Sequence, residues 1–457
     1  MSGFLSIRDS RTGREYRLPV EDNVLQISQL AQIEGPQVSG NGPPKDTSLI
    51  VFDLAAERTA TVKTAVTYID GKTSILAYRG YPAEQVAQQY SYEEASHLLI
   101  FDSLPSSAER NSWRRAIMLA SAGVPEAVAT SINALPRSTA HYALILAGLA
   151  ACLGLQPETI PAQRGSNIYL GNQEAVDAAI PRVLGVFSRV VALAHCHCSG
   201  KSPLNPDPNG SYLYNTCRMM GIATDPRTGE PDAASLALIE KIWVIGMDNG
   251  LTASAASLLN TASTLADPLS AVISSLASAY GILHFGAAES AYRTMQRLGS
   301  PDKVPAAIEQ VKRGKMRLLG VGHRVYKRSD PRLSLVKSIV EGLRQQGKFD
   351  PLLAVAQEIE RCVAADPWFA QRQLVVNIDL YWMFIYTALD IPLGAILPLF
   401  ITSRMAGYMA HWRETMLSKG SHKIWRPRAL YVGRPVDGDS RPAPPEDEHK
   451  RSTKAML

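Results

Sequence analysis

A run of small side chains places the strongest constraint on how this chain can fold. Residues 253–281 contain eight alanines and seven serines among 29 positions. Small side chains let two helices approach closely. Asp267-Pro268 places a helix N-cap, followed by proline at the first helical position, inside the run. The segment predicts a tightly packed pair of internal helices, and it is also compatible with a helical dimer interface.

Local signals divide the rest of the chain into a strand-rich start and a helical remainder. Residues 1 to about 60 alternate in short runs between Gly/Pro breaks, and a hairpin is expected from Ala65 to Gly80 with Asp70-Gly71 as its turn. Helical signals begin near residue 90, where Ser91-Tyr-Glu-Glu94 forms a capping box. Asp350-Pro351 repeats the Asp-Pro helix start.

Composition excludes some classes of protein. The chain has 457 residues, of which 46% are hydrophobic and 19% charged, as in a soluble globular protein of two to four domains. A net charge of +5, from 47 basic and 42 acidic residues, permits anionic small-molecule substrates but does not indicate nucleic-acid binding. The longest apolar run, residues 143–155, is shorter than the roughly 18 residues of a membrane span.

The five cysteines are sparse and odd in number. Such a set does not form a disulfide framework, so a reducing compartment is expected. We expect the cytoplasm rather than a mitochondrion or a peroxisome. Residues 195–198, His-Cys-His-Cys, resemble a metal cluster, but positions i and i+2 of a helix do not share a face. A plain helix end is therefore expected there and no metal site, with a metal or redox role as the alternative.

A histidine on a glycine-flanked turn is the first candidate site. The stretch Gly320-Val-Gly-His-Arg-Val-Tyr-Lys327 is followed by Asp330-Pro331-Arg332. Glycine lets backbone N–H groups approach a ligand, His323 can donate near neutral pH, and the nearby cations attract carboxylates or phosphates. The pattern predicts a site for a polyanionic substrate, although a lone histidine in such a turn is often structural.

Two further segments carry chemistry. His284 lies in Tyr280-Gly-Ile-Leu-His-Phe-Gly-Ala-Ala-Glu289, where it either acts or merely bonds a backbone carbonyl. Asp379 lies in the apolar run Val376-Asn-Ile-Asp-Leu-Tyr-Trp-Met-Phe384. Burial raises the pKa of such an acid and suits it to act as a general base. A helix N-cap is the structural alternative for Asp379.

These three segments resemble motifs of the citrate synthase family. The family patterns are G-x-L-H-G-G-A-N-E, G-x-G-H-R-V-Y-K…D-P-R and N-V-D-F-Y-S-G, in this order along the chain. The chain departs from them at Phe285, Ala288, Trp382 and Met383. The resemblance runs from about residue 60 to 433.

The resemblance implies carbon–carbon bond formation from a thioester, with an acyl-CoA as co-substrate, oxaloacetate as partner and no permanently bound cofactor. Asp379 would be the base, His284 the donor to the enolate oxygen and His323 the donor to the oxaloacetate carbonyl. Each preorganised donor is worth ~3–4 kcal/mol of barrier. By resemblance, further residues bind the substrates' carboxylates (Arg332, Arg404 and Arg426) or coenzyme A (Arg317, Gly320, Val321 and Lys327).

The resemblance also implies the architecture. It is a mainly α, citrate-synthase-like two-domain helical fold with a small N-terminal β region. The expected parts are an N-terminal β/arm region (1–60), a large helical domain (61–285 and 391–433), a small inserted domain (286–390) and a disordered tail (434–457). Arg426 would reach the site of a partner subunit, so a homodimer with a shared active site is expected.

One departure bears on the substrate. Where the family usually has H-A-D-H-E-L-N-A-S, the second histidine, which normally touches oxaloacetate, is Asn249 here. An amide can still donate to oxygen but carries no charge. Together with Phe285 and Trp382, this indicates a reshaped pocket, as in the enzymes of fungal secondary metabolism that make 2-alkylcitrates from longer acyl-CoAs. Ordinary citrate or 2-methylcitrate synthesis, and a non-catalytic carboxylate-binding role, are the alternatives.

Overall fold

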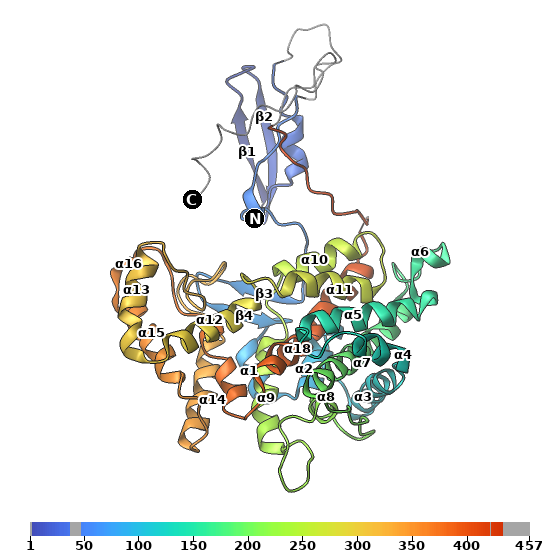
Figure 1. Cartoon of the computed structure of the whole chain (residues 1–457). Coiled ribbons are helices and arrows are strands. Elements are labelled where there is room, and N and C mark those ends of the chain that lie inside the picture. Colours follow the sequence, from blue (N-terminus) through green and yellow to red (C-terminus); the bar gives the residue numbers. More distant parts are fainter. Residues whose placement is uncertain (1, 37–46, 421, 433–457) are drawn as a thin grey trace, which may run out of the picture. The chain divides into compact units, whose positions relative to one another are not determined.

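The computed structural model describes residues 2–36, 47–420 and 422–432. The chain divides into two compact units, Met1–Lys63 with Arg426–Leu457, and Thr64–Trp425. The larger unit is shown with the whole chain in Figure 1. The expected inserted domain at 286–390 stays a prediction, and the expected tail at 434–457 lies outside the described residues.

The smaller unit contains the predicted N-terminal strands. β1 (Ser2–Arg8) pairs with β2 (Glu15–Glu21) in an antiparallel hairpin, in register from Ser2 opposite Glu21 to Arg8 opposite Glu15. Two short 3-10 helices follow, η1 (Ile27–Gln32) and η2 (Leu54–Ala56). Leu18 on β2 and Ile33 after η1 are buried, which gives this unit a small apolar core.

The larger unit is mostly helical, which confirms the expected fold class. Its one sheet among the described residues is small: β3 (Thr67–Asp70), β4 (Ile75–Tyr78) and β5 (Tyr81–Pro82), in the order β3-β4-β5. The first two strands form the predicted hairpin. The helices are α1 Ala83–Gln89, α2 Tyr92–Phe101, α3 Ser107–Ala122, α4 Glu126–Asn133, α5 His141–Gly154, α6 Pro161–Arg164, α7 Gln173–Ser199, α8 Tyr212–Met220, α9 Ala233–Gly246, α10 Ala253–Ala262, α11 Pro268–Ala279, α12 Gly286–Leu298, α13 Val304–Lys312, α14 Leu333–Gln345, α15 Leu353–Ala365, α16 Pro367–Gln371, α17 Met383–Thr387 and α18 Leu393–Met416; short 3-10 turns are η3 Pro157–Thr159, η4 Pro301–Lys303 and η5 Ile378–Leu380.

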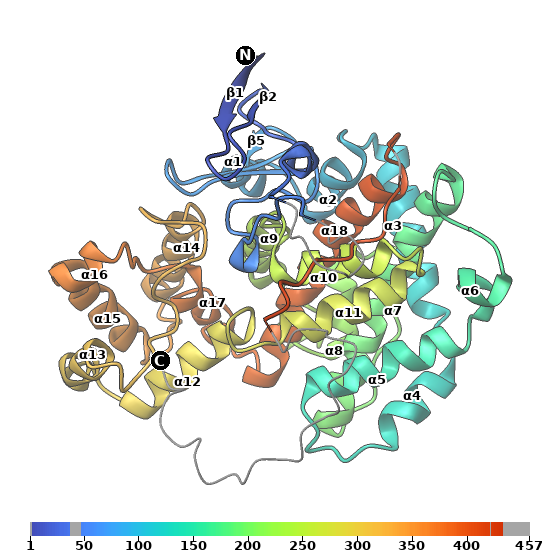
Figure 2. The same cartoon turned by 90° about the horizontal axis from the view of Figure 1, so that it is seen from above.

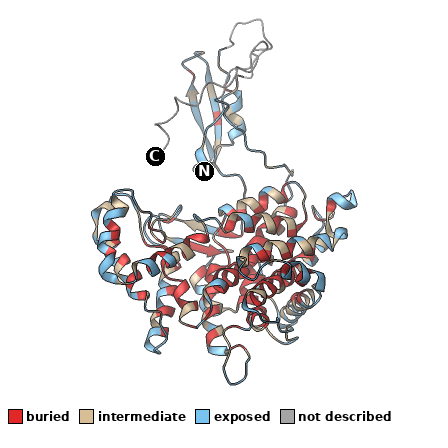
Figure 3. Ribbon diagram, in the orientation of Figure 1, coloured by how far each residue is buried: buried red, intermediate tan, exposed pale blue. Residues whose placement is uncertain are grey.

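The core of the larger unit is built around two long helices. α18 packs against α7, α2 and α10, and α7 packs against α3 and α5. Buried residues concentrate where these helices meet (Figure 3). By length and composition α18 could cross a membrane, but most of it is buried inside the protein, as expected of a core helix. Seen from above, α13 to α16 lie together at one side of this unit (Figure 2).

The small-residue segment folds as predicted, into a pair of helices that pack on each other. α10 and α11 are in close contact, and each begins at a side-chain cap. Thr252 accepts from the amide of Ala255, and Asp267 accepts from the amide of Ser270 with Pro268 at the first helical position. The turn that follows α11 carries His284, so this pair fixes one side of the candidate site.

Two other local predictions have different outcomes. The Asp350-Pro351 helix start is wrong: α15 begins at Leu353, and Asp350 instead accepts from the amide of Leu352 in a preceding turn. The turn chemistry was recognised, but its position relative to the helix was not. The His-Cys-His-Cys segment does lie at a helix end, because α7 ends at Ser199 and Gly200 adopts a left-handed conformation.

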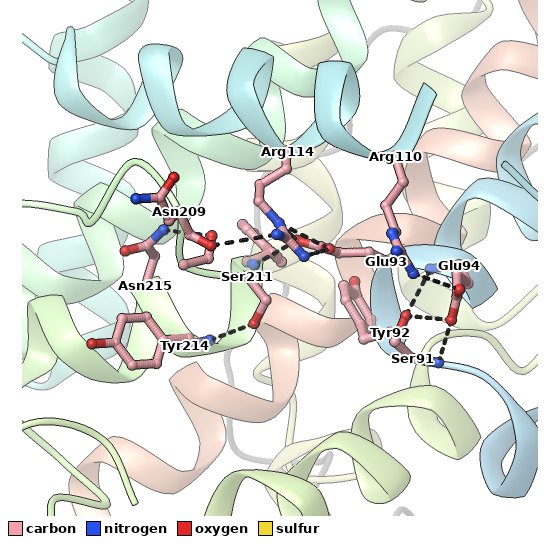
Figure 4. A network of polar contacts seen from close by, with 12 residues as sticks. Ser91, Tyr92, Glu93, Glu94, Arg110, Arg114, Asn209, Ser211, Tyr214 and Asn215 are labelled. Atoms are coloured by element: carbon pink, nitrogen blue, oxygen red, sulfur yellow. Dashed lines mark hydrogen bonds and ion pairs between the residues drawn. The ribbon is translucent and has the colours of Figure 1, made fainter. Parts of the chain in front are cut away.

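A buried polar network connects α2, α3 and α8 (Figure 4). The Glu93 carboxylate, which is almost fully buried, accepts from the guanidinium of Arg114 at 2.6 Å and from the amide of Tyr212 at 2.9 Å. Beside it, Ser91 and Glu94 form the predicted capping box of α2. Glu93 therefore pairs with a cation and accepts from the first amide of α8 in the protein interior.

We predict that Glu93→Ala lowers the free energy of unfolding by about 3 kcal/mol, because it leaves Arg114 and the Tyr212 amide unpaired in the interior. The melting temperature from a thermal scan measures this. Glu341→Ala is the matched control, since it removes an exposed Glu341–Arg344 pair and should change the free energy by less than about 0.5 kcal/mol. Equal melting temperatures for the two variants would contradict the structural role of Glu93.

Candidate active site

Backbone pairing brings the turn that carries His323 next to the segment that carries Asp379. The amide of Gly322 donates to the carbonyl of Val375 at 2.7 Å, and the amide of Asn377 donates to the carbonyl of Gly320 at 3.0 Å. Gly320 has a φ of +82°, and a side chain there would lie 3.1 Å from the backbone nitrogen of Leu380. This short antiparallel contact places the His323 turn directly beside the segment that carries Asp379.

A buried ion pair joins the same two segments. The carboxylate of Asp330 accepts from Nε and Nη2 of Arg332 at 2.9 and 2.7 Å, and it also accepts from the amide of Ile378 at 3.0 Å. Burial acts to raise the pKa of Asp330, but the charge and hydrogen bonds of Arg332, together with the amide of Ile378, hold the pKa below its usual value. Arg332 thus uses two of its donors to hold Asp330, which positions the segment at Ile378, and it also supplies a cation to the site.

His323 has a defined tautomer. Its Nδ1 accepts hydrogen bonds from the amides of Val325 and Tyr326, both at 3.1 Å. A nitrogen that accepts carries no proton, so in the neutral ring the proton is on Nε2. The ring stacks on Tyr326 with centroids 4.6 Å apart. His323 is therefore a fixed Nε2–H donor.

His284 lies in the turn between α11 and α12. Its Nε2 is 2.7 Å from Oγ of Ser254, which in turn accepts from the hydroxyl of Tyr408 at 2.8 Å. The ring stacks on Phe285 with centroids 4.4 Å apart. If Ser254 donates to Nε2, the proton of the neutral ring is on Nδ1. Ser254 orients this donor, although no pattern in the sequence distinguishes it among the seven serines of its segment.

Both histidines are neutral at physiological pH. Burial lowers the pKa of His284 to about 4, helped by the charge of Arg404 and by His323. Burial and the charge of Arg332 lower the pKa of His323 to about 4. Neutral imidazole can donate one hydrogen bond to a developing oxyanion without bringing a charge of its own. The influence of His323 on the pKa of His284 also places the two rings in one site.

Asp379 has the opposite shift. Burial raises its pKa to about 6, although Arg332 opposes the shift. Its amide donates to Oδ1 of Asn377 at 2.9 Å, so Asn377, not Asp379, caps the short 3-10 helix. The N-cap alternative for Asp379 is therefore wrong. A carboxylate with a pKa near neutrality is well matched to abstract a proton.

Arg404 is a buried cation with unused donors. It lies on α18 and is 1% exposed, and its Nε and Nη1 have no hydrogen-bond partner within the described part of the chain. The guanidinium carbon lies 5.1 Å from the ring centre of Phe285. An unpaired buried charge is costly, so a ligand carboxylate is the natural partner.

Asn249 is hydrogen-bonded to the glycine-flanked turn at residues 320–327. Its Oδ1 accepts from the hydroxyl of Tyr326 at 2.8 Å. Behind it, Asp248 is fully buried and accepts from Nε2 of His411 at 3.2 Å and from the amide of Gly250 at 2.8 Å. The amide at position 249 is thus held against the turn that carries His323.

Of the predicted coenzyme A residues, Arg317 and Lys327 are exposed, whereas Gly320 is buried and Val321 is half-buried. Arg317 is exposed and lines a cavity of about 340 Å³ together with Leu283, Arg293 and Arg297. Lys327 is exposed and donates to the carbonyl of His323 at 3.1 Å. One lining residue, Leu283, directly precedes His284 in the sequence. The sequence did not predict Arg293 and Arg297 on α12 as part of this cavity, because only the fold brings them to Arg317.

Another positioning element was not expected. The turn after β3 contacts the glycine-flanked turn at residues 320–327: the amide of Lys327 donates to the carbonyl of Gly71 at 3.2 Å. A side chain at Gly71 would overlap the carbonyl of Val325. Arg426, by contrast, is exposed and belongs to the smaller unit, so its role in a partner's site stays a prediction.

Known proteins are similar to this chain in sequence and in fold. A family model described as "Citrate synthase, C-terminal domain" matches residues 55–428. Similar proteins include "Citrate synthase-like protein oryE" of Aspergillus oryzae, 38% identical over 94% of this chain and 95% of the relative, and "Alkylcitrate synthase phiJ" of a fungal species, 38% identical over 94% of each.

Solved structures of citrate synthases have a similar fold. Citrate synthase from Pyrobaculum aerophilum superposes with a TM-score of 0.73 at 28% identity, covering 89% of this chain and 97% of that one. The enzyme from Thermoplasma acidophilum, solved with carboxymethyl coenzyme A and oxaloacetate, gives a TM-score of 0.74 at 26% identity, covering 84% and 97%. This chain belongs to the citrate synthase family, and it is a citrate synthase-like enzyme.

We predict an acid limb of the pH–rate profile near pH 6. A base must be ionised to accept a proton, so activity is present above the pKa of Asp379 and is lost as the pH falls through it. His284 and His323, with pKa values of about 4, stay neutral across this limb. Steady-state kcat/KM from pH 5 to 8 measures it, and a value that stays constant down to pH 5 would contradict the assignment of Asp379 as the base.

Asp379→Asn keeps the shape of the side chain and removes the base, so kcat should fall by roughly 10³-fold. Asp390→Asn is the matched control, because Asp390 is an exposed acid further along the same segment, and it should leave kcat unchanged. Normal turnover by Asp379→Asn in a thiol-release assay would rule out its role.

Proposed function

We propose that this enzyme condenses an acyl-CoA with oxaloacetate to give a 2-alkylcitrate, with an acyl chain longer than acetyl. The proposal rests on pKa values that are shifted in opposite directions: that of the acid is raised, and those of the two histidines are lowered. Two neutral histidine donors, His284 and His323, accompany a carboxylate, Asp379, with a pKa of about 6. This combination suits removal of a proton next to a thioester carbonyl.

The reaction divides among these three residues. Asp379 takes the proton from the α-carbon of the thioester while His284 donates to the thioester oxygen, which becomes the enolate oxygen. The enolate carbon then attacks the ketone carbon of oxaloacetate, and Nε2–H of His323 donates to the alkoxide that forms. Water hydrolyses the resulting citryl thioester to release free coenzyme A and the citrate-type acid.

Cations account for recognition of oxaloacetate. Arg404 offers unused donors in the interior, and Arg332 supplies a second cation at the same site. Asn249, held by Tyr326, serves as a neutral donor. Arg426 would come from a second copy, which makes the enzyme a homodimer. Exposed alanines on the helical surfaces of α5 and α11 support such a contact: Ala143, Ala150 and Ala277.

The cavity lined by Arg317, Arg293 and Arg297 supports binding of coenzyme A phosphates. The positive charges suit a polyphosphate, and Leu283 places the cavity one residue from His284. Lys327, together with the backbone at Gly320 and Val321, stays part of this proposal. No permanently bound cofactor takes part in the proposed steps.

Two observations favour a longer acyl chain over acetyl or propionyl. Two of the similar proteins are named alkylcitrate synthases, at 38% and 35% identity. In addition, Phe285 and Trp382 line the site with rings where the family usually has small residues. We place the enzyme in secondary metabolism on the same grounds, and in the cytoplasm because its five cysteines are sparse and odd in number. The shifted acid and the paired donors argue against a non-catalytic role.

We predict that oxaloacetate-dependent thiol release is fastest with hexanoyl-CoA among acetyl-, propionyl- and hexanoyl-CoA. Longer alkyl chains gain about 0.8 kcal/mol per buried CH₂ in an apolar site. The measurement is kcat/KM for each thioester, with omission of oxaloacetate as the control. A preference for acetyl- or propionyl-CoA would favour ordinary citrate or 2-methylcitrate synthesis, and silence with all three would favour a binding role.

We predict that Arg404→Met has opposite effects on binding and stability. The KM for oxaloacetate should rise by about 10- to 100-fold, because a charged hydrogen bond is lost. The melting temperature of the free enzyme should stay equal or increase, since an unpaired buried cation is replaced by an apolar side chain. Arg413→Met is the control: Arg413 lies in the last turn of α18 and pairs with Asp177 on α7, and its loss should leave the KM unchanged.

A further inference from the structure

Three aromatic rings form a continuous stack beside the catalytic residues. Trp382 and Phe400 are stacked with centroids 4.3 Å apart and an interplanar angle of 24°, and Phe285 meets Phe400 edge-on at 5.8 Å. We call Phe285, Phe400 and Trp382 the aromatic stack. All three are buried. Gly246 makes room for it, since a side chain there would lie 2.6 Å from the ring of Phe400.

One end of the aromatic stack touches the base. The indole Nε1–H of Trp382 donates to Oδ1 of Asp379 at 3.3 Å. The indole cannot turn freely, because Tyr386 packs edge-on against it at 5.7 Å while Phe400 stacks on its face. Oδ1 is therefore held, and the other carboxylate oxygen is left to face the substrate.

The other end supports the oxyanion donor. His284 stacks on Phe285 with an interplanar angle of 19°. The base and the donor thus rest against the same apolar wall. The cations Arg332 and Arg404 and the donor His323 make up the polar part of the site: both cations act on Asp379, Arg404 and His323 act on His284, and Arg332 acts on His323.

We propose that the aromatic stack has two linked tasks: Trp382 positions Asp379 through its indole N–H, and Phe285 and Phe400 form the surface that receives the alkyl substituent of the acyl group. The inference rests on the proposed condensation.

Geometry places the alkyl chain against this wall. The α-carbon must lie within about 3.5 Å of the free oxygen of Asp379 for proton transfer, and the thioester oxygen must reach His284. Oxaloacetate occupies the cationic part of the site, because its carboxylates need Arg332 and Arg404. A substituent on the α-carbon is therefore left with the rings, where its CH₂ groups exchange water for apolar contact.

The first test is the pH profile of Trp382→Phe, which keeps a ring and removes the N–H. The charged groups that act on Asp379 are Arg332, Asp330 and Arg404, and none of them changes. Loss of a hydrogen bond to the ionised carboxylate raises its pKa, so the acid limb should move up by about 0.5 to 1 pH unit. The kcat should fall about 10-fold with little change in the KM for oxaloacetate.

Trp412→Phe is the matched control for this test. Trp412 is a buried indole on α18 whose Nε1 has no partner among residues 2–36, 47–420 and 422–432. This variant should leave the acid limb in place. An unmoved limb in Trp382→Phe would overturn the positioning role of the indole, and so would an equal shift in both variants.

The second test compares acyl chains. Phe285→Ala should lower the ratio of kcat/KM for hexanoyl-CoA to that for acetyl-CoA by about 10-fold, because roughly two CH₂ groups lose their contact. Phe285→Leu, which keeps apolar bulk, should retain most of the ratio, and Trp382→Phe should retain it fully. A cooperative thermal transition confirms that each variant folds, and that of Phe285→Ala is expected at a lower temperature because a buried ring is lost.

The outcomes separate the two levels of the proposal. If the wild type releases no thiol from any of the acyl-CoAs, the proposed condensation fails and the inference fails with it. If the wild type is active but Phe285→Ala changes both thioesters equally, or improves hexanoyl-CoA, the alkyl chain does not rest on the aromatic stack and only the inference is overturned.

Discussion

The antiparallel contact between the backbone at Gly320–Gly322 and that at Val375–Asn377 is the constraint on which the site depends. It is made of two short backbone hydrogen bonds and is reinforced by Asp330, which accepts from the amide of Ile378. Without it, His323 and Asp379, more than fifty positions apart, would have no reason to meet. The glycines of the signature act here by letting two backbones approach, before any ligand binds.

A second principle is that burial and nearby cations act together on all three residues of one small site. Burial raises the pKa of Asp379 while it lowers that of His323 and His284, because burial disfavours whichever form is charged. Nearby arginines lower all three values, so they limit the shift of the acid and deepen that of the histidines. The same environment therefore gives a base that works near neutrality and donors that carry no charge.

The sequence predicted the elements of this site far better than its connections. His284, His323, Asp379 and Arg404 lie where one site can use them, and the helix pair 253–281 and the 65–80 hairpin were recovered because caps and turn residues are local signals. The Gly71 contact and the Arg293–Arg297–Arg317 cavity were not, since each depends on residues that only tertiary packing brings together. The Asp350-Pro351 start failed because the same dipeptide also begins a simple turn.

Two of the departures from the family pattern, Phe285 and Trp382, meet on a single ring. Phe400 stacks on Trp382 and meets Phe285 edge-on, and Gly246 has no side chain where Phe400 needs space. Phe285 in turn stacks on His284, and Trp382 donates to Asp379. Each of the two departures therefore affects the packing of the other, and both act on the surroundings of the base and the oxyanion donor.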